Sequence, residues 1–173
     1  MTAPRAEVAL FPGTFDPFTN GHLDLTARAA RLFPRVVAAV ARSSTKVPVF
    51  SVEERMEMIG EAVATLPTEV RGRVEVRSFS GLVAGCARDI GAHVMIRGLR
   101  AVSDFEFEFQ MALMNRKLSP ELEIVYLMPD VRYTYLSSGM IKEVARLGGD
   151  VTGLVPEAVL RRVLAKFGHG GGA

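Results

Sequence analysis

The sequence predicts an α/β fold in which helices cover both faces of one parallel, five-stranded sheet. Short apolar runs rich in β-branched residues alternate with longer segments whose apolar residues recur at helical spacing. Residues 36–40 are apolar throughout, as expected of a strand covered on both faces. The length of 173 residues fits one domain. We therefore expect a single Rossmann-like domain over residues 1–167, followed by a disordered glycine-rich tail over residues 168–173.

Local patterns place the individual elements. Val8 to Phe11 form the first expected strand, and a helix should follow with Thr19 or Asn20 as its cap. Another helix should begin at Ser51, because Ser51 and Glu54 have the spacing of a capping box. The other strands are expected at residues 36–40, 74–76, 93–96 and 124–128. The other helices are expected at residues 82–90, from about residue 137 to 147, and after residue 156, with a surface loop at residues 68–73.

The segment from Asp104 to Phe109 fits two structures. Its strict alternation of polar and aromatic residues is typical of a strand. However, Ser103 and Glu106 have capping-box spacing, and apolar residues continue at helical spacing as far as Leu118, so we predict a helix. A second apolar row gives this helix two apolar faces, which suggests a subunit interface.

Composition narrows the classes of function. With 21 basic and 19 acidic residues the net charge is +2, too balanced for a nucleic-acid or membrane partner recruited by bulk charge. No apolar stretch approaches the roughly 18 residues of a membrane span, and the first residues do not resemble a signal peptide. The lone Cys86 excludes an internal disulfide and is expected in the core. We expect a cytoplasmic protein.

Three polar loops follow expected strands and should meet at one edge of the sheet. They cover residues 13–20, 42–46 and 97–100. In parallel sheets ligands bind beyond the carboxyl ends of the strands, where the strand order reverses. These loops supply several cations, and two arginines that flank Gly98 favour an anion because the guanidinium fork matches phosphate oxygens. The sequence therefore predicts a site for phosphorylated ligands at this edge.

The run Thr19-Asn20-Gly21-His22 stands where the first of these loops enters a helix. A helix N-terminus offers unpaired N–H groups and the positive end of the helix dipole, and both attract phosphate. His22 adds a hydrogen-bond donor at the same place. The common nucleotide and zinc motifs, Gly-x-Gly-x-x-Gly, Gly-Lys-Ser/Thr and His-Glu-x-x-His, do not occur in the sequence.

This run resembles the Thr/His-x-Gly-His motif of the nucleotidyltransferase superfamily. The longer stretch at residues 13–22 resembles the opening of the bacterial phosphopantetheine adenylyltransferase family. Similar matches follow at residues 96–100, 104–106, 114–116, 136–138, 142–145 and 149–151. The resemblance extends over almost the whole chain, in the order the family has it. It implies in-line attack by the phosphate of 4′-phosphopantetheine on the α-phosphorus of ATP, with Mg²⁺ required, and it suggests a homohexamer and feedback by coenzyme A.

The same resemblance implies roles for single residues. His22 would stabilise the transition state, Lys46 and Arg97 would bind the acceptor phosphate, and Thr14 would hold both substrates. Val83 and Asn115 match positions along the pantetheine arm. The positions matching ATP contacts are Phe15, Gly98, Leu99, Arg100, Glu108, Tyr133, Thr134, Tyr135, Leu136, Ser137, Ser138 and Gly139. No residue is assigned as a metal ligand. Gly139 departs from the family pattern, where a third serine is usual, so one hydroxyl near the ATP phosphates is missing.

Simpler interpretations of these residues stay open at this point. His22 could only cap its helix, Lys46 could be a solvated loop residue, and the arginines could pair with acidic neighbours such as Asp104. The alternative enzyme is an adenylyl- or cytidylyltransferase for another acceptor, such as nicotinate mononucleotide. The alternative outside the enzymes is a nucleotide-binding module without catalysis.

Overall fold

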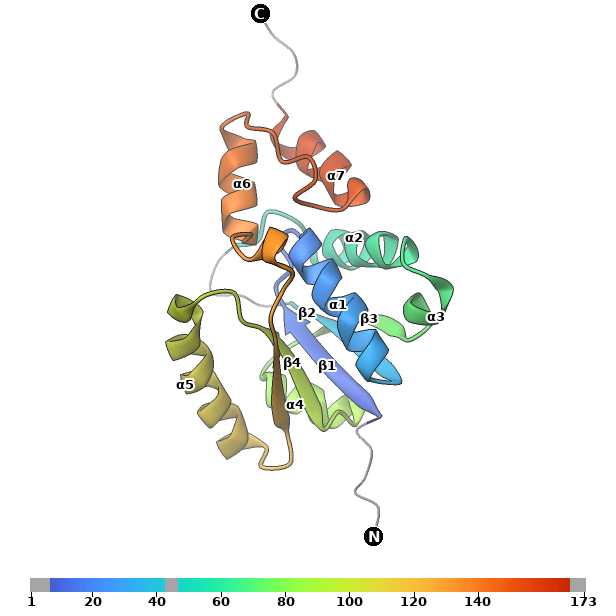
Figure 1. The fold of residues 1–173 in the computed structure, drawn as a ribbon, viewed down its shortest axis with the longest axis vertical. Coiled ribbons are helices and arrows are strands. Elements are labelled where there is room, and N and C mark those ends of the chain that lie inside the picture. Colours follow the sequence, from blue (N-terminus) through green and yellow to red (C-terminus); the bar gives the residue numbers. More distant parts are fainter. Residues whose placement is uncertain (1–6, 43–46, 169–173) are drawn as a thin grey trace, which may run out of the picture.

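The computed structural model describes residues 7–42 and 47–168, and its centre is a five-stranded sheet (Figure 1). All neighbouring strands are parallel, in the order β3-β2-β1-β4-β5. The strands are β1 (Val8–Gly13), β2 (Arg35–Ala41), β3 (Val74–Phe79), β4 (Val94–Gly98) and β5 (Glu123–Leu127). The chain builds outward from β1 to β3 and then crosses to β4 on the other side of β1. The order therefore reverses between β1 and β4, where such sheets bind ligands.

Helices cover both faces of the sheet, which confirms the predicted fold class. On one face α1 (Asn20–Leu32) and α2 (Val52–Ala64) pack against the strands, and on the other α4 (Val83–Ile90) contacts β1 and α5. The helix α5 (Val102–Leu118) lies along the β4–β5 side. The remaining helical segments are α3 (Thr68–Arg71), the 3₁₀ turn η1 (Val131–Tyr133), α6 (Ser138–Arg146) and α7 (Glu157–Phe167).

The apolar strand β2 shows why the sheet is buried on both sides. Val36, Ala38 and Val40 belong to the core under α1 and α2, whereas Val37 and Ala39 belong to the core under α4. Alternate residues of a strand point to opposite faces, so only an uninterrupted apolar run can serve both cores. Cys86 is buried in the second core, as expected. Among the described residues, no helix combines the length and apolar character that a membrane crossing needs.

The structure corrects several predicted boundaries. The capping box of Ser51 and Glu54 forms as predicted. The predicted capping box at Ser103 was wrong, because α5 begins two residues earlier than that cap implies, with Ala101 as its N-cap and no side-chain capping bond. Residues 68–73 were expected to be a loop, but they contain the short helix α3. The strands β3 and β4 extend beyond their predicted ends, so Arg97 and Gly98 belong to β4. The predicted tail, after residue 168, lies outside the described residues.

Candidate active site

A cavity of about 640 Å³ opens at the carboxyl ends of β1 and β4. Its walls come from the β1–α1 loop, the start of α1, the end of β4, the first two turns of α5 and the segment from Pro129 to Lys142. The helix α1 packs closely on β4 at Gly98, where a Cβ would lie 2.6 Å from Leu25 Cδ1 and the leucine side chain would have to shift. This contact brings the first turn of α1 next to Arg97 at the switch point of the sheet.

His22 is fixed by the N-terminal cap of α1. The backbone N–H of Thr19 donates to His22 Nδ1 at 3.0 Å, and Thr19 Oγ1 lies 3.0 Å from the same atom. Thr19 Oγ1 in turn accepts from the His22 backbone N–H at 3.3 Å, which completes a capping box. Because Nδ1 is an acceptor, the neutral ring carries its proton on Nε2. Among the described residues Nε2 has no hydrogen-bond partner, and His22 lines the cavity.

Aromatic rings hold the imidazole in place. The centroids of Phe15 and Phe18 lie 5.2 Å and 5.5 Å from that of His22, and Phe11 lies 6.4 Å away. Phe15 adopts a left-handed backbone conformation with φ of 52°, which is strained for a bulky residue. Such strain persists only where the surroundings fix it, and it is concentrated at functional sites. Here it directs the ring of Phe15 into the cluster that packs against His22.

We predict that His22 stays neutral in the free protein from about pH 8 down to about pH 5. The pKa of His22 is lowered from 6.5 to about 4, mainly by burial, with the charges of Arg100 and Arg97 contributing in the same direction. Between these two values the unfolded chain binds a proton that the folded chain does not. Stability should therefore fall as the pH drops through this window, and this loss is absent above it. An NMR titration of the His22 ring should give a midpoint near 4. A midpoint above 6 for His22 would contradict the assignment.

Arg97 is paired with a buried carboxylate from α5. Its Nε donates to Glu108 Oε2 at 2.9 Å, its Nη2 donates to Glu108 Oε1, and its Nη1 donates to the Pro12 carbonyl at 3.3 Å. Glu108 is 7% exposed. A guanidinium has five N–H donors, so two remain for a ligand after these three bonds. The ion pair thus orients Arg97 without exhausting it.

Arg100 is held in the same manner. Its Nε and Nη2 donate to the two oxygens of Asp104 at 3.0 and 3.1 Å, and its Nη1 donates to the Leu136 carbonyl at 2.6 Å. The bond from Arg100 is the main reason that the pKa of Asp104 lies below its usual range. Arg100 therefore joins the β4–α5 loop to the segment before α6. The pairing with Asp104 that the sequence left open does form, and Arg97 pairs with Glu108 instead.

The first turn of α6 forms the wall opposite β4. Ser137 is the N-cap of α6 and accepts from the Met140 backbone N–H at 3.1 Å. Ser138 Oγ donates to the Pro17 carbonyl at 2.7 Å, which ties α6 to the β1–α1 loop. Both serines and Gly139 line the cavity. A helix start of this kind attracts phosphate.

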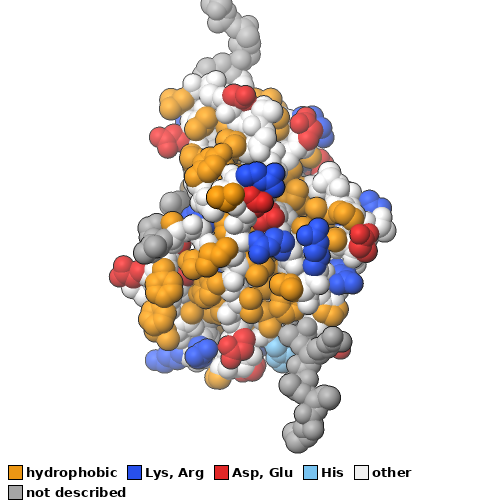
Figure 2. Space-filling view, in the orientation of Figure 1, with side chains coloured by type: hydrophobic (Ala, Val, Ile, Leu, Met, Phe, Trp, Pro, Cys, Tyr) orange, Lys and Arg blue, Asp and Glu red, His pale blue; other side chains and the backbone are white. Residues whose placement is uncertain are grey.

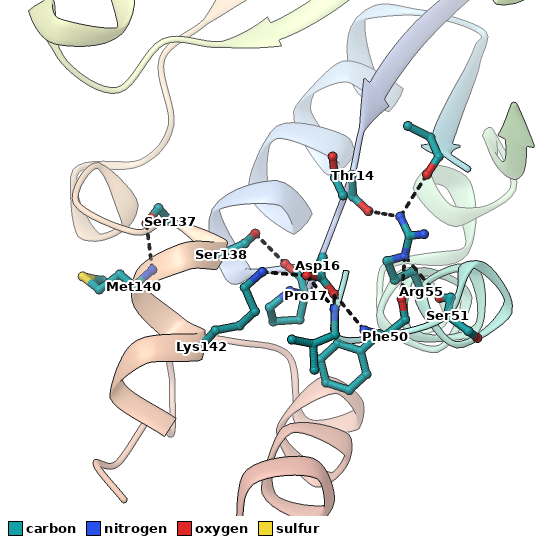
Figure 3. A network of polar contacts seen from close by, with 12 residues as sticks. Thr14, Asp16, Pro17, Phe50, Ser51, Arg55, Ser137, Ser138, Met140 and Lys142 are labelled. Atoms are coloured by element: carbon teal, nitrogen blue, oxygen red, sulfur yellow. Dashed lines mark hydrogen bonds and ion pairs between the residues drawn. The ribbon is translucent and has the colours of Figure 1, made fainter. Parts of the chain in front are cut away.

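Two buried charges organise the β1–α1 loop (Figure 3). Arg55, which is 1% exposed, donates to the carbonyls of Thr14, Ala41, Phe50 and Ser51 at 2.7 to 3.2 Å. Asp16, which is 3% exposed, accepts from the backbone N–H groups of Val49 and Phe50. Its second oxygen lies 2.6 Å from Lys142 Nζ on α6. These contacts define the position of Thr14 at the cavity wall.

Most of the predicted site residues meet in this cavity. Its lining includes Thr14, Phe15, His22, Arg97, Gly98, Arg100, Glu108, Tyr133, Leu136, Ser137, Ser138 and Gly139. Leu99, Thr134, Tyr135, Val83 and Asn115 are not among its lining residues, and their predicted contacts stay predictions. The amide of Asn115 donates to the Met111 carbonyl within α5. Lys46 lies outside the described residues.

Sequence analysis missed several residues of the wall. The sequence context of Asp16 indicates only a turn residue, yet its carboxylate is buried and bonded to Lys142. Lys142 was predicted only as part of a matching motif, without a role of its own. Phe107 was assigned to packing or an interface, but it lines the cavity. The position of Lys142 five residues after the helix cap Ser137 was the signal available, because it places the side chain near the first turn of α6.

The arrangement suits a ligand with several phosphates. Arg97, Arg100 and Lys142 each pair with one carboxylate, and His22 adds a neutral donor. Within residues 7–42 and 47–168 there is no group of three acidic, histidine or cysteine side chains that could hold a metal ion. Such a cavity can bind and orient phosphoryl groups and stabilise charge that develops on them.

Comparison with known proteins agrees with this class of site. The model of the cytidylyltransferase-like family matches residues 10–144, a stretch that runs from within β1 to within α6. The chain therefore belongs to the cytidylyltransferase-like nucleotidyltransferases. Two curated relatives narrow the assignment. Each is 52% identical to the chain, over 165 residues in Desulforudis audaxviator and 163 residues in Methylococcus capsulatus. The matches cover 95% and 94% of this chain and 98% of each relative, and both relatives are named phosphopantetheine adenylyltransferase. The chain is a member of the phosphopantetheine adenylyltransferase family, which confirms the resemblance found in the sequence.

Solved structures confirm the fold. A bifunctional NMN adenylyltransferase/ADP ribose pyrophosphatase from Francisella tularensis matches with a TM-score of 0.68 over 92% of this chain, at 13% identity. The same protein complexed with AMP and a manganese ion matches with a TM-score of 0.69. The chain spans about half the length of that protein, 50% and 48% in the two structures.

Proposed function

We propose that this protein transfers the adenylyl group of ATP to 4′-phosphopantetheine, and that dephospho-coenzyme A and pyrophosphate are released. The observation that supports this most directly is the convergence of His22, Arg97 and Arg100 on one cavity at the switch point of the sheet. Family membership supplies the substrates, since both curated relatives are named for this acceptor. The reaction belongs to the biosynthesis of coenzyme A.

The mechanism is an in-line displacement at the α-phosphorus of ATP. A phosphate oxygen of the acceptor forms the new bond to that phosphorus, and the bond to the β-phosphate oxygen breaks as pyrophosphate leaves. The acceptor phosphate is already anionic, so no strong general base is needed. Positioning and stabilisation of charge therefore provide the rate enhancement.

Each residue of the cavity has a role in this proposal. The Nε2–H of His22 donates to a non-bridging oxygen of the α-phosphate, where negative charge increases in the transition state. The two unused N–H groups of Arg97, together with Lys46, bind the acceptor phosphate. Arg100 and the first turn of α6 bind the ATP phosphates. Thr14 lies at the wall shared by both substrates.

Mg²⁺ is proposed to arrive with ATP and not to occupy a site made of protein side chains. The carboxylates of the cavity wall are engaged, since Asp16 pairs with Lys142, Asp104 with Arg100 and Glu108 with Arg97. Mg²⁺ is commonly bound through substrate phosphates and water with few protein ligands. The ion would neutralise phosphate charge that the paired cations leave uncompensated.

Assembly into a homohexamer is proposed on the basis of α5. Apolar side chains gather over this helix (Figure 2), and Phe105 and Phe109 are 56% and 52% exposed. Their rings stack at 6.0 Å, which creates a flat surface larger than scattered single residues would give. Burial of this surface against other copies would remove it from water. Sedimentation equilibrium should give six chains per particle, and a monomer would contradict the proposal.

Coenzyme A is proposed as a feedback ligand, because it combines the pantetheine arm of one substrate with the adenosine of the other. Competition with ATP in the assay below would test this. The cytoplasm is the proposed compartment, in agreement with a single reduced cysteine. One nucleotidyltransferase domain over residues 1–167 accounts for all of these roles.

The decisive experiment incubates the purified protein with ATP, Mg²⁺ and 4′-phosphopantetheine and detects dephospho-coenzyme A by mass spectrometry. Nicotinate mononucleotide serves as the competing acceptor, and pyrophosphate release is measured for both. We expect product with 4′-phosphopantetheine as the acceptor and none with nicotinate mononucleotide. Pyrophosphate released only with nicotinate mononucleotide would reject the acceptor, and ATP binding without any product would reject the enzyme.

A further inference from the structure

We propose that Asp16 and Lys142 form a positioning pair that fixes the first turn of α6 relative to the β1–α1 loop, and thereby sets the affinity for ATP. The inference rests on the proposed function, in which residues 137–139 bind the nucleotide. It assigns a role to two residues that lie in the cavity wall but have no part in the mechanism described above. Neither residue is proposed to touch a reacting atom.

The pair joins segments that are far apart in the sequence. Lys142 Nζ lies 2.6 Å from Asp16 Oδ2, across a sequence separation of 126 residues (Figure 3). The Asp16 side chain is 4% exposed and the Lys142 side chain 22% exposed, so solvent screens the interaction less than at a surface pair. A short ion pair in these surroundings restricts both side chains.

Asp16 is itself held rigidly, so it can serve as an anchor. Its Oδ1 accepts from the backbone N–H groups of Val49 and Phe50 at 3.0 and 2.9 Å, and its Oδ2 accepts from Val49 at 3.1 Å. Arg55 donates to carbonyls on either side, at Thr14 and at Phe50. The carboxylate therefore cannot follow Lys142 if α6 shifts. The position of α6 must adjust to Asp16.

The ion pair of Lys142 is a contact of α6 that can be removed without removing a residue predicted to bind a ligand. The other polar ties run from Ser138 to Pro17 and from Arg100 to Leu136, and they involve residues proposed to bind ATP. The helix α6 also keeps an apolar attachment, because Ile141 and Ala145 are buried in the core. Loss of the Lys142 charge should therefore let the first turn of α6 move while the helix stays folded.

The test compares Lys142→Met with Lys142→Arg in steady-state kinetics with both substrates. We expect Lys142→Met to raise the KM for ATP about tenfold, which corresponds to about 1.4 kcal/mol, with the KM for 4′-phosphopantetheine within about twofold of wild type. Lys142→Arg keeps a cation and should recover most of the affinity for ATP. The matched control is Arg162→Met, which removes a cation paired with Glu57 and Glu61 away from the cavity and should leave both KM values unchanged.

Asp16→Asn separates positioning from direct contact with the nucleotide. The amide oxygen can still accept from Val49 and Phe50, but the ion pair is lost. If the pair acts as a unit, Asp16→Asn raises the KM for ATP as Lys142→Met does. The KM for ATP of the double variant is then no higher than that of the more impaired single variant. If Lys142 instead binds the nucleotide itself, Asp16→Asn leaves the KM for ATP unchanged or lowers it, and the proposal is wrong.

Two further outcomes would also overturn the inference. A parallel rise of both KM values, or no recovery of the affinity for ATP in Lys142→Arg, would indicate general loss of structure, which thermal melting of each variant would register. An unchanged KM for ATP in Lys142→Met would show that α6 needs no such tie. In contrast, a wild-type protein without dephospho-coenzyme A synthesis would defeat the proposed function, and the two failures are thus distinguishable.

Discussion

Replacement of His22 by alanine is expected to lower kcat by about 10²–10³-fold while the protein still folds and binds ATP. The imidazole Nε2–H is the donor that the cap geometry leaves for the α-phosphate, because Nδ1 is taken up by Thr19. A loss of this size corresponds to about 3–4 kcal/mol of transition-state stabilisation. Since His22 is already neutral near pH 7, the expected effect is loss of a donor and not loss of a proton-transfer base. Steady-state kinetics with saturating substrates measure it.

His22→Gln tests whether the histidine only caps its helix. Glutamine at the third helical position is a natural partner in a capping box, so it can accept from the Thr19 N–H and keep the start of α1 intact. We expect this variant to melt close to wild type and to remain slow. His93→Ala is the control for a histidine in the exposed part of the chain, and it should keep full activity. Normal turnover in His22→Gln would remove Nε2 from the mechanism and leave the cap as its whole role.

The fold could be predicted because the apolar patterns of strands and of helices are local properties of the chain. The apolar run of β2 and the capping box before α2 each decide an element within a few residues. The end of α5 could also be predicted locally. Its start could not, because the capping-box pattern at Ser103 competed with a helix start two residues earlier, after Ala101. Where two helix starts are equally acceptable in the local sequence, tertiary packing decides between them.

The site could be predicted only as far as loops at the same edge of the sheet imply proximity. This argument brought His22, Arg97 and Arg100 together. It could not choose partners for them, because the sequence of α5 offers more than one carboxylate. Arg97 pairs with Glu108, one turn beyond the Asp104 that pairs with Arg100. The contact between Asp16 and Lys142 could not be predicted from the positions of the loops. No local pattern links residues 126 apart, and their contact depends on how α6 packs beside the β1–α1 loop.

Replacement of Arg97 by alanine is expected to raise the Kd for 4′-phosphopantetheine by about 10- to 100-fold and the Kd for ATP much less. Loss of a hydrogen bond to a charged group costs about 1.5–3 kcal/mol, which gives this range. The variant has a second effect, since it leaves the carboxylate of Glu108 buried without its ion-pair partner. A buried unpaired charge is destabilising, so the melting temperature should also fall.

The double variant Arg97→Ala/Glu108→Gln separates the two effects. Glutamine removes the unpaired charge at almost the same volume, so the melting temperature should return toward wild type. Affinity for the acceptor should not return, because the two N–H groups proposed to bind its phosphate are the ones that Arg97 leaves unused, and the double variant lacks them. Titration calorimetry with each substrate measures this directly. If acceptor binding recovers together with stability, Arg97 acts only as the structural partner of Glu108. If ATP binding is lost more than acceptor binding, Arg97 belongs to the nucleotide side of the cavity and not to the acceptor site.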